Sequence, residues 1–258
     1  MAKKCARCGK EIDCKHDVSC FCVPFAMSDA MRAYLKEHYN DCLCQDCLSA
    51  VKAKFANTLI LDFGGVIMNH NVEGAIQRFE ELIGKEAVQR ELGFPYSIEN
   101  EETMIFKFEK GDCTTEEFVE HVKRLAHQHN PNRSVTTEQV REAWNISHAG
   151  IDQDKFDFLK RMKQQGKTIY MLSNINPIHW EHAVEKYHIA DYYDYCCLSY
   201  EYKCSKPHLD IAQKFAKNRG LDPADAVFVD DLELNRQMGW QMGWGVFESI
   251  YEYQKALQ

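Results

Sequence analysis

The chain has 258 residues, which is enough for one sizeable α/β domain and a small appendage. A hydrophobic content of 45% and a charged content of 27% are ordinary for a globular protein, so disordered and fibrous classes are excluded. The net charge of -8 argues against attraction of the whole chain to nucleic acid or to an anionic membrane surface. Nucleic acid is therefore not an expected partner, and small-molecule chemistry fits the composition better.

The first residues indicate the compartment. The start MAKKCARCGK has two lysines followed by cysteines and charges, which is not the pattern of a signal peptide. No run of the sequence approaches the roughly 18 apolar residues that a membrane helix requires. We therefore expect a cytoplasmic protein without a membrane partner, in which closely spaced thiols are metal ligands more often than disulfides.

Cysteines divide the chain into two parts. Of the 12 cysteines, eight lie before residue 50 and four are scattered over the rest. This break predicts a cysteine-rich module over residues 1–50, followed by a short helical linker over 48–57. The eight early cysteines are Cys5, Cys8, Cys14, Cys20, Cys22, Cys42, Cys44 and Cys47.

The spacing of these thiols predicts Zn²⁺ binding. CARC, CFC and CLCQDC place thiols two or three residues apart, so that one tight turn can hold a tetrahedral ion. A module of about 50 residues also has too little core to fold without such a staple. Eight thiols are enough for two sites of four thiolates each, so His16 is not expected to be a metal ligand. An iron–sulfur cluster remains open but lacks a characteristic spacing, while disulfides and a nucleic-acid-binding finger are weaker alternatives.

The arrangement of a CxxC start, a central CxC and a closing CLCxxCL resembles that of small cysteine-rich, CWC-like bacterial proteins. This resemblance implies a zinc module. It says little about activity, and it leaves a protein partner of the module open.

The rest of the chain alternates between strands and helices. The run TLILDFGGVI starts it, and a helical region over 72–150 follows, with capping-box pairs at Thr114 with Glu117 and at Thr136 with Gln139. This alternation predicts an α/β fold, a mainly parallel sheet with helices on both faces and a helical lid over its carboxyl edge. The later predicted elements are a helix at 152–166, a strand at 167–174, a helix at 177–188, a short strand around 194–201, a helix at 208–220, a strand at 226–229 and an apolar run at 244–249.

Three acids follow two of the predicted buried strands. Asp62 comes after LIL, and Asp230 with Asp231 comes after AVFV, so all three are expected at the carboxyl edge of the sheet. Their mutual repulsion would be unfavourable without a hard cation, and Mg²⁺ prefers such oxygen ligands. The alternative is that these acids are ordinary helix caps or loop residues.

Other polar residues lie at the same predicted edge. Ser173 and Asn174 end the run IYMLSN and could hold a phosphoryl oxygen, while Lys206 precedes a proline at a helix start. An aspartate that attacks phosphate needs a cation for the equatorial oxygens and a hydroxyl to orient them. Each residue alone could belong to a cap or a turn, so the order along the chain carries the information.

That order, LILDFGGV, YMLSN, SKP and FVDD, resembles the four motifs of the haloacid dehalogenase superfamily over roughly residues 57–250. The resemblance implies a Rossmann-like core at 57–71 and 151–258 and an inserted helical cap at 72–150. It also implies residue roles, which we give as expectations. These are Asp62 as nucleophile and Mg²⁺ ligand, Ser173 and Lys206 as phosphoryl-binding and catalytic residues, Asn174 as an assisting residue, Asp230 as a further Mg²⁺ ligand, Asp231 as a supporting one and the Gly64 carbonyl as a backbone ligand.

The sequence departs from the superfamily at one position. Its phosphatases usually carry a second aspartate two residues after the nucleophile, which protonates the leaving group, and this chain has Gly64 there. Losing a general acid costs on the order of 10²–10⁴ in rate unless His70, His179 or a cap residue substitutes. Paired acids in FVDD still favour phosphate chemistry over a dehalogenase, and the missing acid disfavours a mutase.

We therefore expect hydrolysis of a small phosphorylated metabolite through an aspartyl-phosphate. One alternative is a catalytically weak or silent binding protein, which Gly64 supports. Another is a zinc-dependent interaction module to which the phosphatase domain is a passenger.

Overall fold

The computed structural model describes residues 3–15, 17–94, 102–132 and 134–258. Two compact units share the chain. Unit 1 comprises Met1–Asp62, Asp157–Met171 and Lys206–Gln258, and unit 2 comprises Phe63–Phe156 and Leu172–Ser205. His16 lies outside the described residues, and so does the part of the predicted helical region at 95–101.

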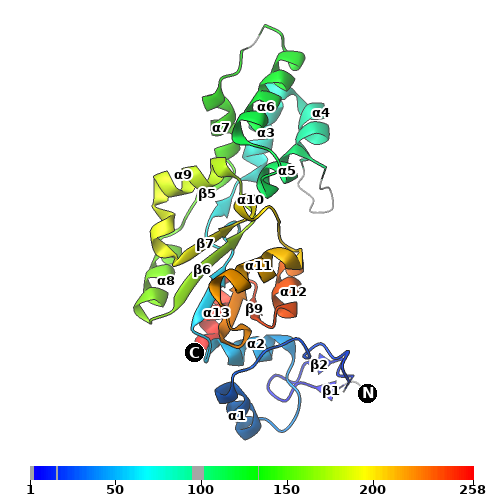
Figure 1. The fold of residues 1–258 in the computed structure, drawn as a ribbon, viewed down its shortest axis with the longest axis vertical. Helices are drawn as coiled ribbons and strands as arrows, with labels where there is room; N and C mark the ends of the chain where they lie inside the picture. Colours follow the sequence, from blue (N-terminus) through cyan, green and yellow to red (C-terminus); the bar gives the residue numbers. More distant parts are fainter. Residues whose placement is uncertain (1–2, 16, 95–101, 133) are drawn as a thin grey trace. The chain divides into compact units, whose positions relative to one another are not determined.

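A five-stranded sheet has the strand order β7-β6-β3-β8-β9. Three of its strands, β6, β7 and β9, are labelled in Figure 1. Strand β3 pairs in parallel with β6 and β8, and β8 pairs in parallel with β9. Strands β3 and β8 are buried along their whole length, as expected of parallel strands covered on both faces. The predicted α/β fold with a parallel sheet is confirmed. The strands are β3 at Thr58–Leu61, β6 at Thr168–Ser173, β7 at Tyr195–Leu198, β8 at Ala226–Val229 and β9 at Gly245–Phe247.

The cysteine-rich segment belongs to unit 1, together with most of the sheet. It contains a two-stranded antiparallel ladder, β1 at Lys3–Lys4 and β2 at Glu11–Ile12. The helices of unit 1 are α1 at Asp29–His38, α2 at Gln45–Ala53, α11 at Leu209–Arg219, α12 at Glu233–Gln241 and α13 at Ile250–Leu257, and α8 at Gln153–Gln164 lies mostly within it.

Helix α2 begins earlier than the predicted linker and is packed rather than free. Its Ser49 hydroxyl accepts a hydrogen bond from the backbone N–H of Val246 in β9, at 3.0 Å. Val51 and Lys52 of the same helix are buried. The predicted boundary at residue 50 therefore falls inside a helix that rests on the sheet.

Two side chains join the cysteine-rich segment to the rest of unit 1. The ammonium group of Lys52 donates to the carbonyl oxygens of Ala26, Pro223 and Gly243, at 2.9, 2.6 and 2.5 Å. The indole of Trp240 in α12 stacks on Phe25 with ring centroids 4.6 Å apart. Its N–H also donates to the carbonyl of Phe21, at 2.6 Å.

Unit 2 is largely helical and has its own apolar core. Phe79, Phe118 and Trp144 are buried at its centre, where the Phe118 and Trp144 rings lie 5.6 Å apart. Both predicted capping boxes are present, at Thr114 and Thr136. Its main elements are β4 at Asn69–His70, α3 at Val72–Ile83, a π-helical turn at Val88–Leu92, α5 at Met104–Lys110, α6 at Thr115–His129, α7 at Thr137–Asn145, β5 at His148–Gly150, α9 at Pro177–Tyr187 and α10 at Ser199–Tyr202.

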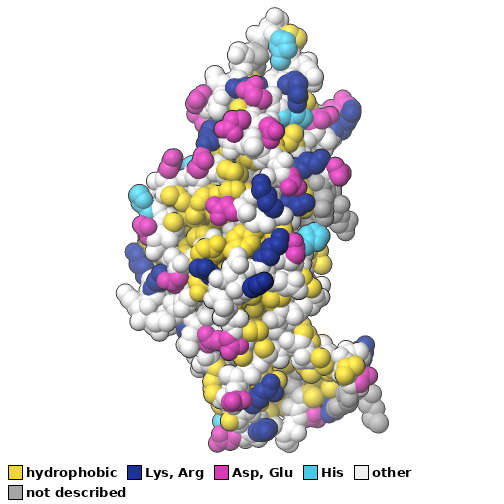
Figure 2. All heavy atoms as spheres, viewed as in Figure 1, with side chains coloured by type: hydrophobic (Ala, Val, Ile, Leu, Met, Phe, Trp, Pro, Cys, Tyr) yellow, Lys and Arg dark blue, Asp and Glu magenta, His cyan; other side chains and the backbone are white. Residues whose placement is uncertain are grey.

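The face drawn in Figure 2 shows no large patch made only of positively charged side chains. Lys and Arg side chains are interspersed there with Asp and Glu (Figure 2). Among the described residues, no helix combines the length and the apolar character needed to cross a bilayer.

Candidate active site

Asp62 and Asp230 are neighbours because of strand register. Leu61 pairs with Val229, so the next residue of each strand lies at the same level of the sheet. The ladder continues one residue further, since the N–H of Asp62 donates to the Val229 carbonyl at 2.9 Å and that of Asp230 donates to the Phe247 carbonyl at 3.0 Å. Two buried strands thus deliver two carboxylates to one edge.

Lys206 lies between these carboxylates. Its ammonium nitrogen is 2.9 Å from a carboxylate oxygen of Asp62 and 2.5 Å from one of Asp230. The Lys206 and Asp230 side chains are 1% and 0% exposed, so water screens this triad very little. The structure therefore brings together three of the residues that the sequence singled out.

Asp230 is held by neighbours that the sequence analysis missed. The Asn235 amide donates to both of its carboxylate oxygens, at 3.0 and 3.1 Å, and the N–H of Leu232 donates to one of them at 3.0 Å. The Arg236 guanidinium donates to the backbone carbonyls of Asp230 and Asp231. Asn235 and Arg236 lie on α12, five and six residues after Asp230, and no strand-end signal marks them.

Burial and charge shift the protonation of this triad. Burial raises the pKa of Asp62 to about 7, with the Lys206 ammonium opposing the shift and the Asp230 carboxylate adding to it. Burial lowers the pKa of Lys206, but the carboxylates of Asp230 and Asp62 outweigh burial and raise the pKa overall. Lys206 therefore stays charged at neutral pH.

The donor set fits Mg²⁺. Carboxylate oxygens of Asp62, Asp230 and Asp231 all lie within 4.8 Å of one another. Three carboxylates face one ammonium group, so the cluster keeps an excess of negative charge. Hard oxygen ligands at such separations are what Mg²⁺ binds in proteins.

The remaining predicted residues of this site belong to unit 2. Ser173 is the last residue of β6, two residues past Met171, which pairs with Leu61. Its side chain is buried, and its hydroxyl donates to the carbonyl of Asn174, at 3.4 Å. Gly64 follows the nucleophile candidate by two residues. The predicted roles of Gly64, Ser173 and Asn174 beside the carboxylates remain predictions.

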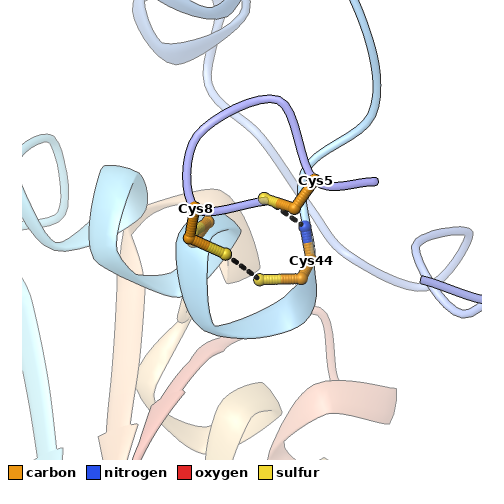
Figure 3. A group of neighbouring side chains, drawn as sticks. Cys5, Cys8 and Cys44 are labelled. Atoms are coloured by element: carbon orange, nitrogen blue, oxygen red, sulfur yellow. Dashed lines mark hydrogen bonds between the residues drawn. The ribbon is translucent and has the colours of Figure 1, made fainter. Parts of the chain in front are cut away.

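Four early cysteines form one cluster. The sulfur atoms of Cys5, Cys8, Cys44 and Cys47 all lie within 4.8 Å of one another. The Cys8 and Cys44 sulfurs are 3.7 Å apart, and the backbone N–H of Cys44 donates to the Cys5 sulfur at 3.3 Å (Figure 3). A tetrahedral ion with Zn–S bonds of about 2.3 Å requires sulfurs about 3.8 Å apart, so this first set has the right size.

The other four early cysteines are linked by contacts of similar length. The Cys14 sulfur is 3.6 Å from that of Cys42 and 3.8 Å from that of Cys20, and Cys22 is 3.6 Å from Cys20. These distances are far too long for a disulfide bond of about 2.05 Å. All eight thiols are free.

One thiol of each set has a lowered pKa. For Cys5, burial alone would raise the pKa, but hydrogen bonds from the backbone N–H groups of Cys44, Cys8 and Arg7 lower it to about 6. The backbone N–H groups of Cys22 and Lys15 lower the pKa of Cys20 to about 7. Burial raises the pKa of Cys44 and Cys47 in the first set and of Cys22 and Cys42 in the second. Thiolates are the form that binds metal, so Cys5 and Cys20 are the thiols most ready to act as ligands.

The fold and the carboxylate cluster are those of a hydrolase with an aspartate at the end of its first sheet strand. The family model of the haloacid dehalogenase-like hydrolases matches residues 56–243, and the chain belongs to this family. Residues 5–49 match the family model of the cysteine-rich CWC domain. Both predicted resemblances are confirmed.

Two relatives come from Bacteroides thetaiotaomicron. The D-ribitol-5-phosphate phosphatase is 28% identical over 197 residues, which are 74% of this chain and 90% of the relative. A HAD family enzyme solved in complex with magnesium and inorganic phosphate is 27% identical, with a TM-score of 0.64 over 74% of this chain and 93% of that chain. A predicted HAD-like hydrolase from Porphyromonas gingivalis, 23% identical, shares the fold with a TM-score of 0.64, over 75% of this chain and 90% of that chain.

Proposed function

We propose that this protein hydrolyses small phosphate monoesters in a Mg²⁺-dependent reaction. The observation that carries the proposal is the buried triad in which Lys206 lies between Asp62 and Asp230. A carboxylate at a strand end, a fixed ammonium group and further oxygen ligands are the parts that phosphoryl transfer to an aspartate needs. The relatives named for phosphatase activity and for bound magnesium and phosphate support the same reading.

In this proposal Asp62 attacks phosphorus and forms an aspartyl-phosphate, which water then hydrolyses. Lys206 binds an equatorial phosphoryl oxygen and offsets its charge, while Ser173 and Asn174 orient the group. Asp62, Asp230, Asp231 and the Gly64 carbonyl would hold Mg²⁺, which supplies charge neutralisation on the phosphoryl oxygens when bound. Asn235 holds the Asp230 carboxylate in place by donating to both of its oxygens.

The substrate class is a phosphorylated small metabolite, and a sugar-alcohol phosphate is the first candidate. The relative named as a D-ribitol-5-phosphate phosphatase is aligned along 90% of its length, which supports a similar leaving group. D-ribitol 5-phosphate therefore heads a panel of phosphorylated metabolites that would identify the substrate.

The cysteine-rich module would carry two Zn²⁺ ions in a cytoplasmic protein, where thiols stay reduced. Its packing against Trp240 and Val246 gives it a structural role toward the sheet of unit 1. A protein partner of the module is the second candidate role.

The test is turnover of p-nitrophenyl phosphate with Mg²⁺. We expect the wild type to be active, EDTA to abolish turnover and Mg²⁺ to restore it, and Asp62→Asn to lose at least about 10³-fold in kcat because the nucleophile is gone. Asp210→Asn is the matched control, since Asp210 is a half-exposed acid on α11 of the same unit. A wild type without turnover on any phosphate ester would favour a silent binding protein.

A further inference from the structure

The two thiol sets differ in how far solvent reaches them. The structure describes all 12 cysteines, and Cys8 alone among them is exposed. The other three members of the first set are buried. In the second set, Cys14 and Cys20 are buried, while Cys22 and Cys42 are half-buried. The first set therefore presents to solvent one thiol for which the second set has no equivalent.

A cavity of unit 1 borders the exposed thiol. Its volume is about 940 Å³, and Cys8, Cys44 and Cys47 line one part of it. Arg236 of α12 and Phe247 at the end of β9 line another part. All of these residues belong to unit 1. A small solute can therefore enter beside Cys8 and approach the buried thiols of the same set.

The thiol of Cys44 lies within bonding reach of Cys8. Their sulfur atoms are 3.7 Å apart and point toward each other (Figure 3). A disulfide bond is about 2.05 Å long, so the two sulfurs have to approach by about 1.6 Å to form one. Rotation of the exposed Cys8 side chain can supply a movement of this size. An accessible cysteine with a second thiol beside it is the arrangement found in oxidant-sensitive sites.

We propose that Cys8 and Cys44 form a redox modification site, at which hydrogen peroxide converts the first thiol set to a disulfide while the second set stays reduced. The inference rests on the zinc-binding role proposed for the module and does not depend on the phosphatase reaction. As metal ligands, both cysteines are thiolates.

The oxidation takes two steps. The Cys8 thiolate attacks one oxygen of the peroxide, the O–O bond breaks and hydroxide leaves, so that Cys8 becomes a sulfenic acid. The Cys44 thiolate then attacks the Cys8 sulfur, the S–O bond breaks, and a second hydroxide leaves as the disulfide forms. The two thiolates together lose two electrons, and the peroxide gains them.

The disulfide removes two of the four ligands of the first set. Cys5 and Cys47 remain, and two thiolates are too few for a tetrahedral structural site. The first set then no longer holds an ion. Cys44 is the N-cap of α2, whose Ser49 accepts a hydrogen bond from Val246 in β9. Oxidation therefore acts at the start of the helix that rests on the sheet.

Zinc release from the purified full-length protein tests this site. With a zinc-binding dye present, we expect hydrogen peroxide to release one ion of the wild type at least about tenfold faster than the other. Cys42→Ser, which keeps only the first set intact, should release its ion at the fast rate. Cys8→Ser, which keeps only the second set, should release its ion at the slow rate. Cys196→Ser, at a half-buried cysteine outside both sets, should behave as the wild type.

Peptide mapping identifies the bond in the wild type and so does not depend on how well a variant folds. After peroxide treatment and alkylation of the free thiols, trypsin should yield peptide 8–10 joined to peptide 37–52, with fragment ions that place the bond at Cys44. Disulfides within the second set at the same peroxide dose, Cys8 without a disulfide, or equal release rates in Cys8→Ser and Cys42→Ser would overturn the inference. A protein that binds no zinc even after incubation with the metal would instead refute the proposed zinc-binding role, and the mapped disulfide would still decide whether Cys8 and Cys44 are the oxidised pair.

Discussion

At the scale of single residues, the centre of the molecule is a lysine shared by two carboxylates. A buried ion pair contributes little net stability compared with an apolar pair, but removing one partner leaves uncompensated charge behind. Lys206 forms such a buried ion pair, because its side chain is 1% exposed and contacts both Asp62 and Asp230. Its presence between the two carboxylates is therefore better explained by a role in the reaction than by a gain in folding stability.

Lys206→Met should reveal this arrangement in the folding equilibrium. Without the ammonium group, the fully buried Asp230 carboxylate loses its countercharge, so we expect the free energy of unfolding without Mg²⁺ to fall by about 3–5 kcal/mol. Urea denaturation measures it. Lys214→Met, at a half-exposed lysine 3.8 Å from Asp210, should change it by less than about 0.5 kcal/mol. A loss below about 1 kcal/mol for Lys206→Met would show that the carboxylates do not need this cation.

A second buried lysine makes stability depend on pH. Burial lowers the pKa of Lys52 to about 7, with Asp222 and Asp225 opposing the shift. The unfolded value is about 10.4, so between these two values the unfolded chain binds more protons at this site than the folded chain. The free energy of unfolding therefore rises with pH across this window, and the full destabilising effect is present below pH 7.

Lys52→Met should remove that rise. Between pH 7 and 10, we expect the free energy of unfolding of the wild type to rise by up to about 1.4 kcal/mol per pH unit relative to that of the variant. Lys54→Met, at an exposed lysine, should show the same pH dependence as the wild type. Urea denaturation at several pH values gives the difference. Parallel stability curves for wild type and Lys52→Met would contradict the shifted pKa.

At the scale of elements, the two thiol sets interleave along the chain. The CxxC at Cys5 and Cys8 meets Cys44 and Cys47. The other four form a chain of contacts, in which Cys42 meets Cys14, Cys14 meets Cys20 and Cys20 meets Cys22. Neighbouring thiols in CLCQDC thus belong to different sets. Spacing alone predicts that eight thiols suit two ions, but the grouping depends on how β1, β2 and α2 come together.

Single substitutions should remove one ion each. We expect the purified wild type to carry two Zn²⁺ per chain, and Cys8→Ser and Cys42→Ser to carry one each, by elemental mass spectrometry. The melting temperature should fall in both, because the cluster packs with Trp240 and Val246 of the sheet unit. Cys196→Ser, outside both sets, is the control and should retain two ions. Iron in place of zinc, or loss of both ions from either variant, would contradict two independent zinc sites.

The sequence predicted most of the sheet and its acids for a simple reason. Short apolar runs such as LIL and AVFV, each ending in Asp, favour buried strands, and such strands place Asp62 and Asp230 at one edge of the sheet. It did not predict that α2 packs on β9, because the sequence of a short cysteine-rich helix does not indicate which element it packs against. Nor did it predict the ladder of β4 and β5, which is too short to give a periodic signal.

At the scale of the whole molecule, the cysteine-rich segment is continuous with the unit that carries the carboxylates. Lys52 reaches the carbonyls of Pro223 and Gly243, and Trp240 stacks on Phe25. A module attached by a free linker would make no such contacts. The cysteine-rich segment therefore supports the sheet of unit 1 in this chain.

The family explains why a few residues decide the chemistry. The haloacid dehalogenase-like fold places an aspartate at the end of its first sheet strand, and unit 1 surrounds Asp62 with Lys206 and Asp230. The proposed nucleophile Asp62 and its charged neighbours Lys206 and Asp230 all lie in unit 1. Ser173, the proposed phosphoryl-binding residue, belongs to unit 2.

The proposed mechanism requires that Asp62 becomes phosphorylated during turnover. Acid quenching of the enzyme during reaction with a ³²P-labelled substrate and Mg²⁺, followed by peptide mapping, measures this directly. We predict acid-stable, hydroxylamine-sensitive label on the peptide that contains Asp62, and none in Asp62→Asn. Turnover without any labelled peptide, or label on a different residue, would contradict the nucleophilic role of Asp62.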